Sequence, residues 1–211
     1  MSRARAIAGG AAAALHASSL FLFPLAVLAG VRLLGPRATA LLLLAAIVLG
    51  ALLGRRTAPR GPPGLLLTSA VAVLLLVAAA LDDARLMLAY PVLVNAIFLA
   101  QFAGTLVHGP PLVERIARRQ VPDLSASEVR YCRTVTGVWS VFFVLNGAIA
   151  AALAVAASRV WWALYTGVLS YVLVALLFAV EYVVRKARFG RYGRGPVDRA
   201  LFALLGDARA R

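Results

Sequence analysis

Long apolar runs, separated by short polar segments, occupy most of this chain of 211 residues. A helix that crosses a bilayer needs about 20 mostly apolar residues, and six runs come near that length. These runs are 15–34, 38–54, 64–81, 86–107, 134–157 and 160–184. The pattern therefore predicts an all-α, polytopic transmembrane bundle with a span for each run, formed by residues 1–184 as a single domain.

The longest polar segment inside the predicted bundle, the connector 108–133, has a helical pattern of its own. Its apolar and charged residues occupy opposite helical faces up to Pro122, as in a short helix that lies in the membrane interface. The apolar face holds Leu112, Val113, Ile116 and Ala117, and the charged face holds Glu114, Arg115, Arg118 and Arg119. Ser125 and Glu128 then have the spacing of a capping box, which predicts a new helix from near Ala126 into the fifth run.

A basic tail, 185–211, follows the last run and ends in a second amphipathic pattern. Its apolar face consists of Val197, Ala200, Leu201, Leu204 and Leu205. We expect a cytoplasmic helix that rests on lipid headgroups, and docking of a partner protein is the alternative.

Basic residues fix the orientation of the predicted spans. Of the 22 Lys and Arg residues, 18 fall on one side of the bundle when alternate segments are taken together. Because the side rich in Lys and Arg stays in the cytoplasm, both termini are predicted to be cytoplasmic. The uncharged run 6–31 exceeds the roughly 7–15 apolar residues of a signal peptide, so we expect a retained first span.

The composition agrees with a membrane protein and changes the meaning of the charge. Hydrophobic residues make up 63% of the chain, whereas soluble domains contain about 45–50%. A net charge of +14 would indicate nucleic acid as the partner of a soluble protein. Here most of the excess faces the anionic inner leaflet, so we expect lipid headgroups as the partner and no nucleic acid. The single cysteine, Cys132, excludes a disulfide within the chain.

Two asparagines are the best candidates for a polar site within the membrane. Asn95 and Asn146 each lie near the middle of a predicted span. The two spans are antiparallel neighbours, so we expect the two side chains at similar depth. They either join the helices by a hydrogen bond, which we favour because small residues follow Asn146, or line a polar cavity for a substrate. Gln101 and Ser140 are candidates to extend the same network.

The two ends of the last run carry residues typical of membrane interfaces. Trp161, Trp162 and Tyr165 predict an aromatic belt at the outer interface. At the other end, Glu181 and Arg185 have the i, i+4 spacing of an ion pair at the inner boundary.

Few residues have the chemistry of a catalytic or metal site. Asp82 and Asp83 resemble the aspartate-rich motifs that hold Mg²⁺ and diphosphate in prenyl-transferring membrane enzymes. They lie on the predicted outer face without a partner motif, so we expect them to pair with Arg85 or Arg159 instead. The common protease, nucleotide-binding and hydrolase motifs are missing from the sequence, and two histidines cannot form a three-histidine zinc site. We therefore expect no catalytic residue, cofactor or metal.

The connector is the expected functional surface, because it combines a basic face with two ordered helix starts. It is predicted to act on cytoplasmic lipid headgroups or on a peripheral envelope or lipid-biosynthesis protein. The candidate residues are Glu114, Arg115, Arg118, Arg119, Arg130 and Arg133.

Five segments resemble a family of bacterial inner-membrane proteins that occurs in gene clusters for aryl-polyene and related pigment lipids. They are 90–95 (YPVLVN), 109–118 (GPPLVERIAR), 122–124 (PDL), 129–133 (VRYCR) and 139–147 (WSVFFVLNG). The resemblance implies a multi-pass protein of the inner (plasma) membrane with a role in envelope assembly or lipid handling.

A more distant similarity, over about residues 21–184, is to the intracellular septation protein family. It rests on Asp82, Asp83, Arg85, the segment 112–115, Trp139, Phe142, Phe143, Gly147, Ser158, Trp162 and Tyr165. The chain departs from that family at Ala150, where the family has asparagine, and at Thr166, where it has lysine. A septation role is therefore not expected.

Three functions follow in order of preference. The first is a non-enzymatic factor for envelope or pigment-lipid assembly. The second is a small lipid or isoprenoid transporter, or flippase, with a polar site at the two asparagines. The third is a membrane-embedded lipid-modifying enzyme.

Overall fold

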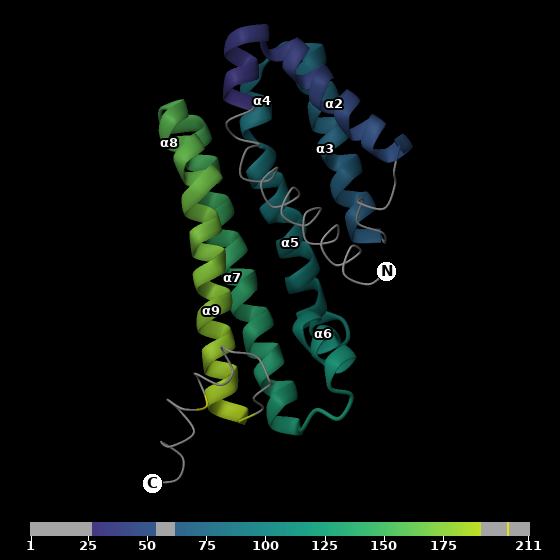
Figure 1. Ribbon diagram of the computed structural model, residues 1–211, viewed down its shortest axis with the longest axis vertical. Helices are drawn as coiled ribbons and strands as arrows, with labels where there is room; N and C mark the ends of the chain where they lie inside the picture. Colours follow the sequence, from purple (N-terminus) through teal and green to yellow (C-terminus); the bar gives the residue numbers. More distant parts are fainter. Residues whose placement is uncertain (1–26, 54–61, 191–201, 203–211) are drawn as a thin grey trace, which may run out of the picture.

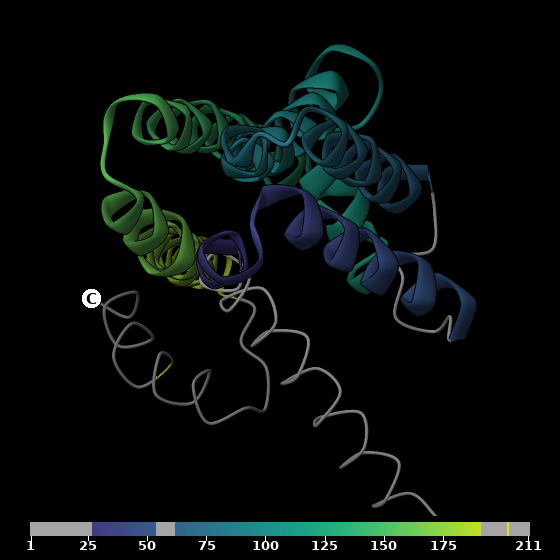
Figure 2. The same ribbon diagram turned by 90° about the horizontal axis from the view of Figure 1, so that it is seen from above.

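The computed structural model describes residues 27–53, 62–190 and 202, and every element in this part of the chain is a helix. The bundle is elongated, and α5, α7 and α9 run along its long axis (Figure 1). Seen from above, α7 and α9 lie on one side of the bundle and α2 and α3 on the other (Figure 2). The predicted all-α class is confirmed. The first predicted run and the amphipathic pattern of the tail lie mostly outside the described residues.

The described chain begins with a helical hairpin that lies beside the main helices. Residues 27–34 are helical and end at Gly35, whose φ of +81° favours glycine. The next helices are α2 (Pro36–Leu53) and α3 (Pro62–Leu81), which pack against each other. Each begins at a proline, which lacks the N–H that a first helical turn leaves without a partner. Buried residues from all three helical segments form one core cluster.

The predicted run 86–107 is divided into two helices, α4 (Ala84–Leu88) and α5 (Tyr90–Val107). Pro91 explains the break, because it has no N–H to donate and its ring crowds the preceding turn. Asp83 caps α4 by accepting a hydrogen bond from the backbone N–H of Arg85, and Asp82 accepts one from the backbone N–H of Arg37. The two acids therefore bond to backbone N–H groups of arginines rather than to arginine side chains.

The connector forms α6 (Leu112–Gln120), and the next helix, α7 (Ala126–Ala156), begins at the predicted residue. The predicted capping box is confirmed. The Ser125 hydroxyl accepts from the backbone N–H of Glu128, and the Glu128 carboxylate accepts from the backbone N–H of Ser125. Because of this start, α7 extends the predicted fifth run into the connector.

The last run forms three helical segments without a break. These are α8 (Arg159–Leu164), the π-helical turn η1 (Tyr165–Leu169) and α9 (Ser170–Phe189). Gly190 ends α9 with a left-handed φ of 63°. Of the three residues of the predicted aromatic belt, Trp161 is the exposed one, at 61%. Trp162 is fully buried, and its indole N–H donates to the carbonyl of Leu88.

Three described helices are long and apolar enough to cross a membrane, by length and composition: Tyr90–Val107, Ala126–Ala156 and Arg159–Phe189. Two shorter apolar helices cover Pro36–Leu49 and Thr68–Leu81. The outer faces of the long helices expose large apolar side chains such as Val141 and Leu176. Burial in hydrocarbon removes the cost of this exposure, so the chain has the features of a membrane protein.

Candidate functional site

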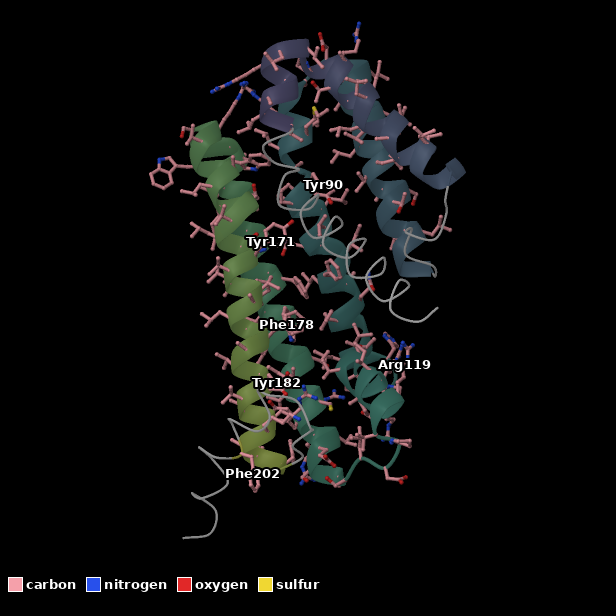
Figure 3. All side chains as sticks on the ribbon, in the orientation of Figure 1. Tyr90, Arg119, Tyr171, Phe178, Tyr182 and Phe202 are labelled. Atoms are coloured by element: carbon pink, nitrogen blue, oxygen red, sulfur yellow. The ribbon has the colours of Figure 1, made fainter. Side chains whose placement is uncertain are left out.

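The helices α5, α7 and α9 line a partly open cavity of about 700 Å³, and residues of α6 line one end of it. It reaches from Tyr90 and Asn146 to Arg185, over most of the length of α9. The space exists because α7 and α9 make few backbone contacts, although α5 and α7 pack closely. Figure 3 shows Tyr171 and Phe178 on the side of α9 that faces the other two helices.

One end of the cavity is a network of uncharged polar groups. The Asn146 Nδ2 donates to Asn95 Oδ1 over 3.0 Å, and Asn95 Nδ2 donates to the carbonyl of Pro91 over 2.7 Å. The Tyr165 hydroxyl donates to Asn146 Oδ1 over 2.8 Å. The predicted hydrogen bond between the two asparagines is therefore present, and it joins α5 to α7.

Gly147 explains how α5 and α7 approach closely enough for this bond. A Cβ atom on Gly147 would lie 3.1 Å from the Cβ atom of Asn95. That separation is shorter than ordinary contact between carbon atoms, which is about 3.5–4.0 Å. The glycine therefore sets the spacing of the two helices at the polar network.

The network serves packing and also lines the cavity. In the described part of the chain, every buried side-chain nitrogen or oxygen has a hydrogen-bond partner. This agrees with the favoured interpretation of the asparagines as a link between helices. Asn95, Asn146 and Tyr165 nevertheless all line the cavity, so the two interpretations apply to the same residues.

The other two candidates for the network lie apart from it. The buried Ser140 hydroxyl donates to the carbonyl of Thr136, within α7. Gln101 is half-buried on α5 and is not among the residues that line the cavity. Tyr165 extends the hydrogen-bond network in place of Gln101 and Ser140. The sequence analysis did not identify this role, because it assigned Tyr165 to the membrane interface.

The middle of the cavity is lined by aromatic rings. The buried Trp139 lies at the centre, with the Phe178 ring centroid 4.5 Å away across the gap to α9. Three further phenylalanines surround Trp139, namely Phe102, Phe142 and Phe143. Such a wall offers a large apolar surface with few rotatable bonds. Since α5, α7 and α9 all contribute, the sequence pattern of one helix does not reveal it.

The end of the cavity near α6 carries charge. Arg185 Nε lies 3.1 Å from Glu181 Oε1, so the predicted i, i+4 pair is present. The Tyr131 hydroxyl of α7 donates to the backbone carbonyl of Glu181 over 3.4 Å. A smaller cavity of about 160 Å³ adjoins this end, and Arg185 lines both spaces together with Ala117, Tyr131 and Cys132.

The helix α6 is held firmly against the bundle. Its first turn has no side-chain cap of its own. Instead, the Leu112 N–H donates to Thr105 Oγ1 of α5 over 3.0 Å, and the Val113 N–H donates to Thr136 Oγ1 of α7 over 3.4 Å. Arg133 of α7 donates to the carbonyl of Leu106 over 2.9 Å, at the end of α5. The connector is therefore part of the bundle.

The predicted charged face of α6 is wrong for one residue. Glu114, assigned to the exposed charged face, is 5% exposed, and its Oε1 lies 2.7 Å from Arg118 Nη2. Ile116, on the predicted apolar face, is 47% exposed and lines the large cavity. Because α6 packs against α7, its buried face is set by that contact rather than by amphipathicity alone.

The remaining basic candidates lie at the surface. Arg115 is exposed and donates through Nε to the carbonyl of Pro110. Arg130 is exposed on α7, and Figure 3 shows Arg119 on the outer side of α6. These exposed side chains make the end of the bundle that holds α6 strongly basic.

In the described ranges, no group of three or more His, Cys, Asp or Glu side chains is arranged to hold a metal ion. The observed site is thus an apolar cavity with a hydrogen-bonded end and a charged end. The chain matches no protein-family model, no curated protein and no solved structure.

Proposed function

We propose that this chain is a non-enzymatic, multi-pass protein of the bacterial inner membrane that holds the apolar chain of a membrane amphiphile. It would act in envelope or pigment-lipid assembly. The cavity between α5, α7 and α9 is the observation that carries this proposal. Its volume of about 700 Å³ falls within the roughly 300–1,000 Å³ of pockets that hold one small ligand.

The lining of the cavity favours a hydrocarbon ligand. Most lining residues are apolar or aromatic, and the polar groups are concentrated at the two ends. At the network end, Asn95, Asn146 and Tyr165 already bond to one another. These groups have few free hydrogen bonds for a polar substrate, whereas the rings around Trp139 offer contact along a chain.

The membrane arrangement is part of the same proposal. We infer six spans with both termini in the cytoplasm, and therefore the end that holds α6 in the cytoplasm. The distribution of Lys and Arg along the sequence supports this orientation. The resemblance to the family from pigment-lipid gene clusters supports a ligand with a long apolar chain.

Quenching of Trp139 fluorescence tests whether a chain enters the cavity. Bromine atoms quench an indole on contact, so a fatty acid brominated at mid-chain reports the occupancy of the aromatic wall. The experiment uses the full chain in detergent with Trp161→Phe, because Trp161 is 61% exposed. We expect saturable quenching that is lost when Trp139→Phe is added.

A pair of variants on α9 provides the matched control. Val174 lines the cavity, whereas Val172 is exposed on α9 and is not among the lining residues. Val174→Phe should fill the space and weaken the quenching, and Val172→Phe should leave it unchanged. Quenching that never saturates, or that is equal in the two variants, would contradict occupancy of the cavity.

A further inference from the structure

The charged end of the cavity differs from the rest in the residues that it offers to a ligand. Among the described residues, eight basic and three acidic side chains belong to α6, the first turns of α7 and the last turns of α9. The basic residues are Arg115, Arg118, Arg119, Arg130, Arg133, Arg185, Lys186 and Arg188. A ligand that enters from this end therefore meets an excess of positive charge.

We propose that the junction of the two cavities binds the anionic head group, a carboxylate or a phosphate, of a single-chain amphiphile, with Arg185 as the main contact. This inference rests on the proposed function, because the apolar chain of the same molecule would occupy the large cavity. The head would lie at the smaller cavity, beside Arg185 and Tyr131.

The geometry of Arg185 leaves the two terminal nitrogens of its guanidinium group available to bind a ligand. Its ion pair with Glu181 uses Nε. In the part of the chain that the structure describes, the two terminal Nη atoms have no hydrogen-bond partner. These two nitrogens form the fork that matches the paired oxygens of a carboxylate or phosphate.

The existing pair does not prevent this binding. The Arg185 side chain is 44% exposed, and solvent screens such i, i+4 pairs strongly. A ligand oxygen can therefore share the guanidinium with Glu181 at small cost.

Tyr131 supplies a second donor at the same place. Its hydroxyl lies 3.4 Å from the carbonyl of Glu181, which is longer than the usual O–H···O distance of about 2.7–2.8 Å. A head-group oxygen at the junction would offer this hydroxyl a shorter bond.

The acids around the junction are each held by a partner, which lowers their repulsion of an anion. Glu114 pairs with Arg118, and Glu181 pairs with Arg185. Glu128 accepts hydrogen bonds at the start of α7. Lys186, which lines the smaller cavity, adds a further positive charge.

The test compares head groups on one brominated chain, read through Trp139 in the full-length protein in detergent. The probes are the fatty acid, its methyl ester and the alkyl phosphate with the same chain. We expect the acid and the phosphate to bind about tenfold more tightly than the ester, which is the effect of about one charge-assisted hydrogen bond. The anion with the higher affinity, carboxylate or phosphate, identifies the chemistry of the head group.

Substitutions at Arg185 separate recognition of the head from binding of the chain. Arg185→Gln should remove the preference for anions and leave the affinity for the ester unchanged. Arg185→Lys keeps the positive charge that faces Glu181 but lacks the paired Nη donors. This variant should therefore lose most of the preference for anionic probes. Arg119→Gln is the control, because it removes one positive charge from the same end and lines neither cavity.

Two outcomes would overturn the inference. One is equal affinity for acid, phosphate and ester, and the other is an anion preference that survives both substitutions at Arg185. In either case, saturable binding of the ester would leave the proposed function intact. Failure of all three probes to quench would instead contradict the proposed function.

Discussion

The link between α5 and α7 makes a quantitative prediction about stability. Asn146 bonds to both Asn95 and Tyr165, whereas Tyr165 bonds within this network to Asn146 alone. A hydrogen bond between helices in a membrane contributes about 0.6 kcal/mol on average and up to about 1.7 kcal/mol. Asn146→Leu loses two such bonds, so we expect it to cost about 1.2 kcal/mol at the average value.

Asn95→Leu and Tyr165→Phe each lose one bond between helices, which gives about 0.6 kcal/mol for each, apart from the Asn95 bond to the Pro91 carbonyl within α5. In the double variant of Asn95 and Asn146, their shared bond is lost only once. The double variant should therefore cost about 0.6 kcal/mol less than the sum of the two single variants. The same coupling is expected between Asn146→Leu and Tyr165→Phe.

Reversible unfolding by an anionic detergent in mixed micelles measures these free energies. Ser140→Ala is the matched control, because the Ser140 hydroxyl bonds within its own helix. It should show no coupling to Asn95→Leu. Strict additivity of the Asn95 and Asn146 variants would refute the reasoning, since it would mean that the two side chains do not interact.

Two further predictions concern packing and orientation. Gly147→Ala should lower the free energy of unfolding by about 1–3 kcal/mol, as overpacking usually does, because a Cβ atom there meets Asn95. Gly104→Ala is the control: a Cβ atom there has nothing within 4 Å, so the variant should be neutral or stabilising. Unfolding in the same detergent measures both, and equal stability of the two variants would contradict the close approach of α5 and α7. Reporter fusions after Arg119 should show cytoplasmic activity, and fusions after Ser158 should show activity on the outer side. The reverse result would exclude the proposed orientation.

Local signals allowed much of the fold to be predicted. The capping box at Ser125 and Glu128 determines where α7 begins, because both of its hydrogen bonds form within four residues. The contact of Asn95 with Asn146 also followed from the sequence, since two antiparallel spans bring their midpoints to the same depth. Such features depend on few neighbours, and those neighbours are visible in the sequence.

Features that depend on several helices could not be predicted. Glu114 faces inward because α6 packs on α7, and the pattern of α6 alone placed it outside. The aromatic wall of the cavity was missed for a similar reason. Phe178 reads as one more apolar residue of a span, and it becomes part of a wall only opposite Trp139.

The π-helical turn η1 sets which side chains of the last run can act together. From Tyr171 to Arg185, cavity-lining residues recur at steps of three or four, whereas across the turn the two adjacent lining pairs, Tyr165–Thr166 and Ser170–Tyr171, are five residues apart. A π turn accommodates one extra residue, whereas each residue of an α-helix turns it by about 100°. Deletion of one residue there would let the segment close as a plain α-helix, with Tyr165 and Arg185 still on the side of the cavity. The extra residue without a π turn would instead rotate Arg185 by about 100° away from Tyr165, so the turn is what lets the last span hold an added residue and keep both ends of one cavity.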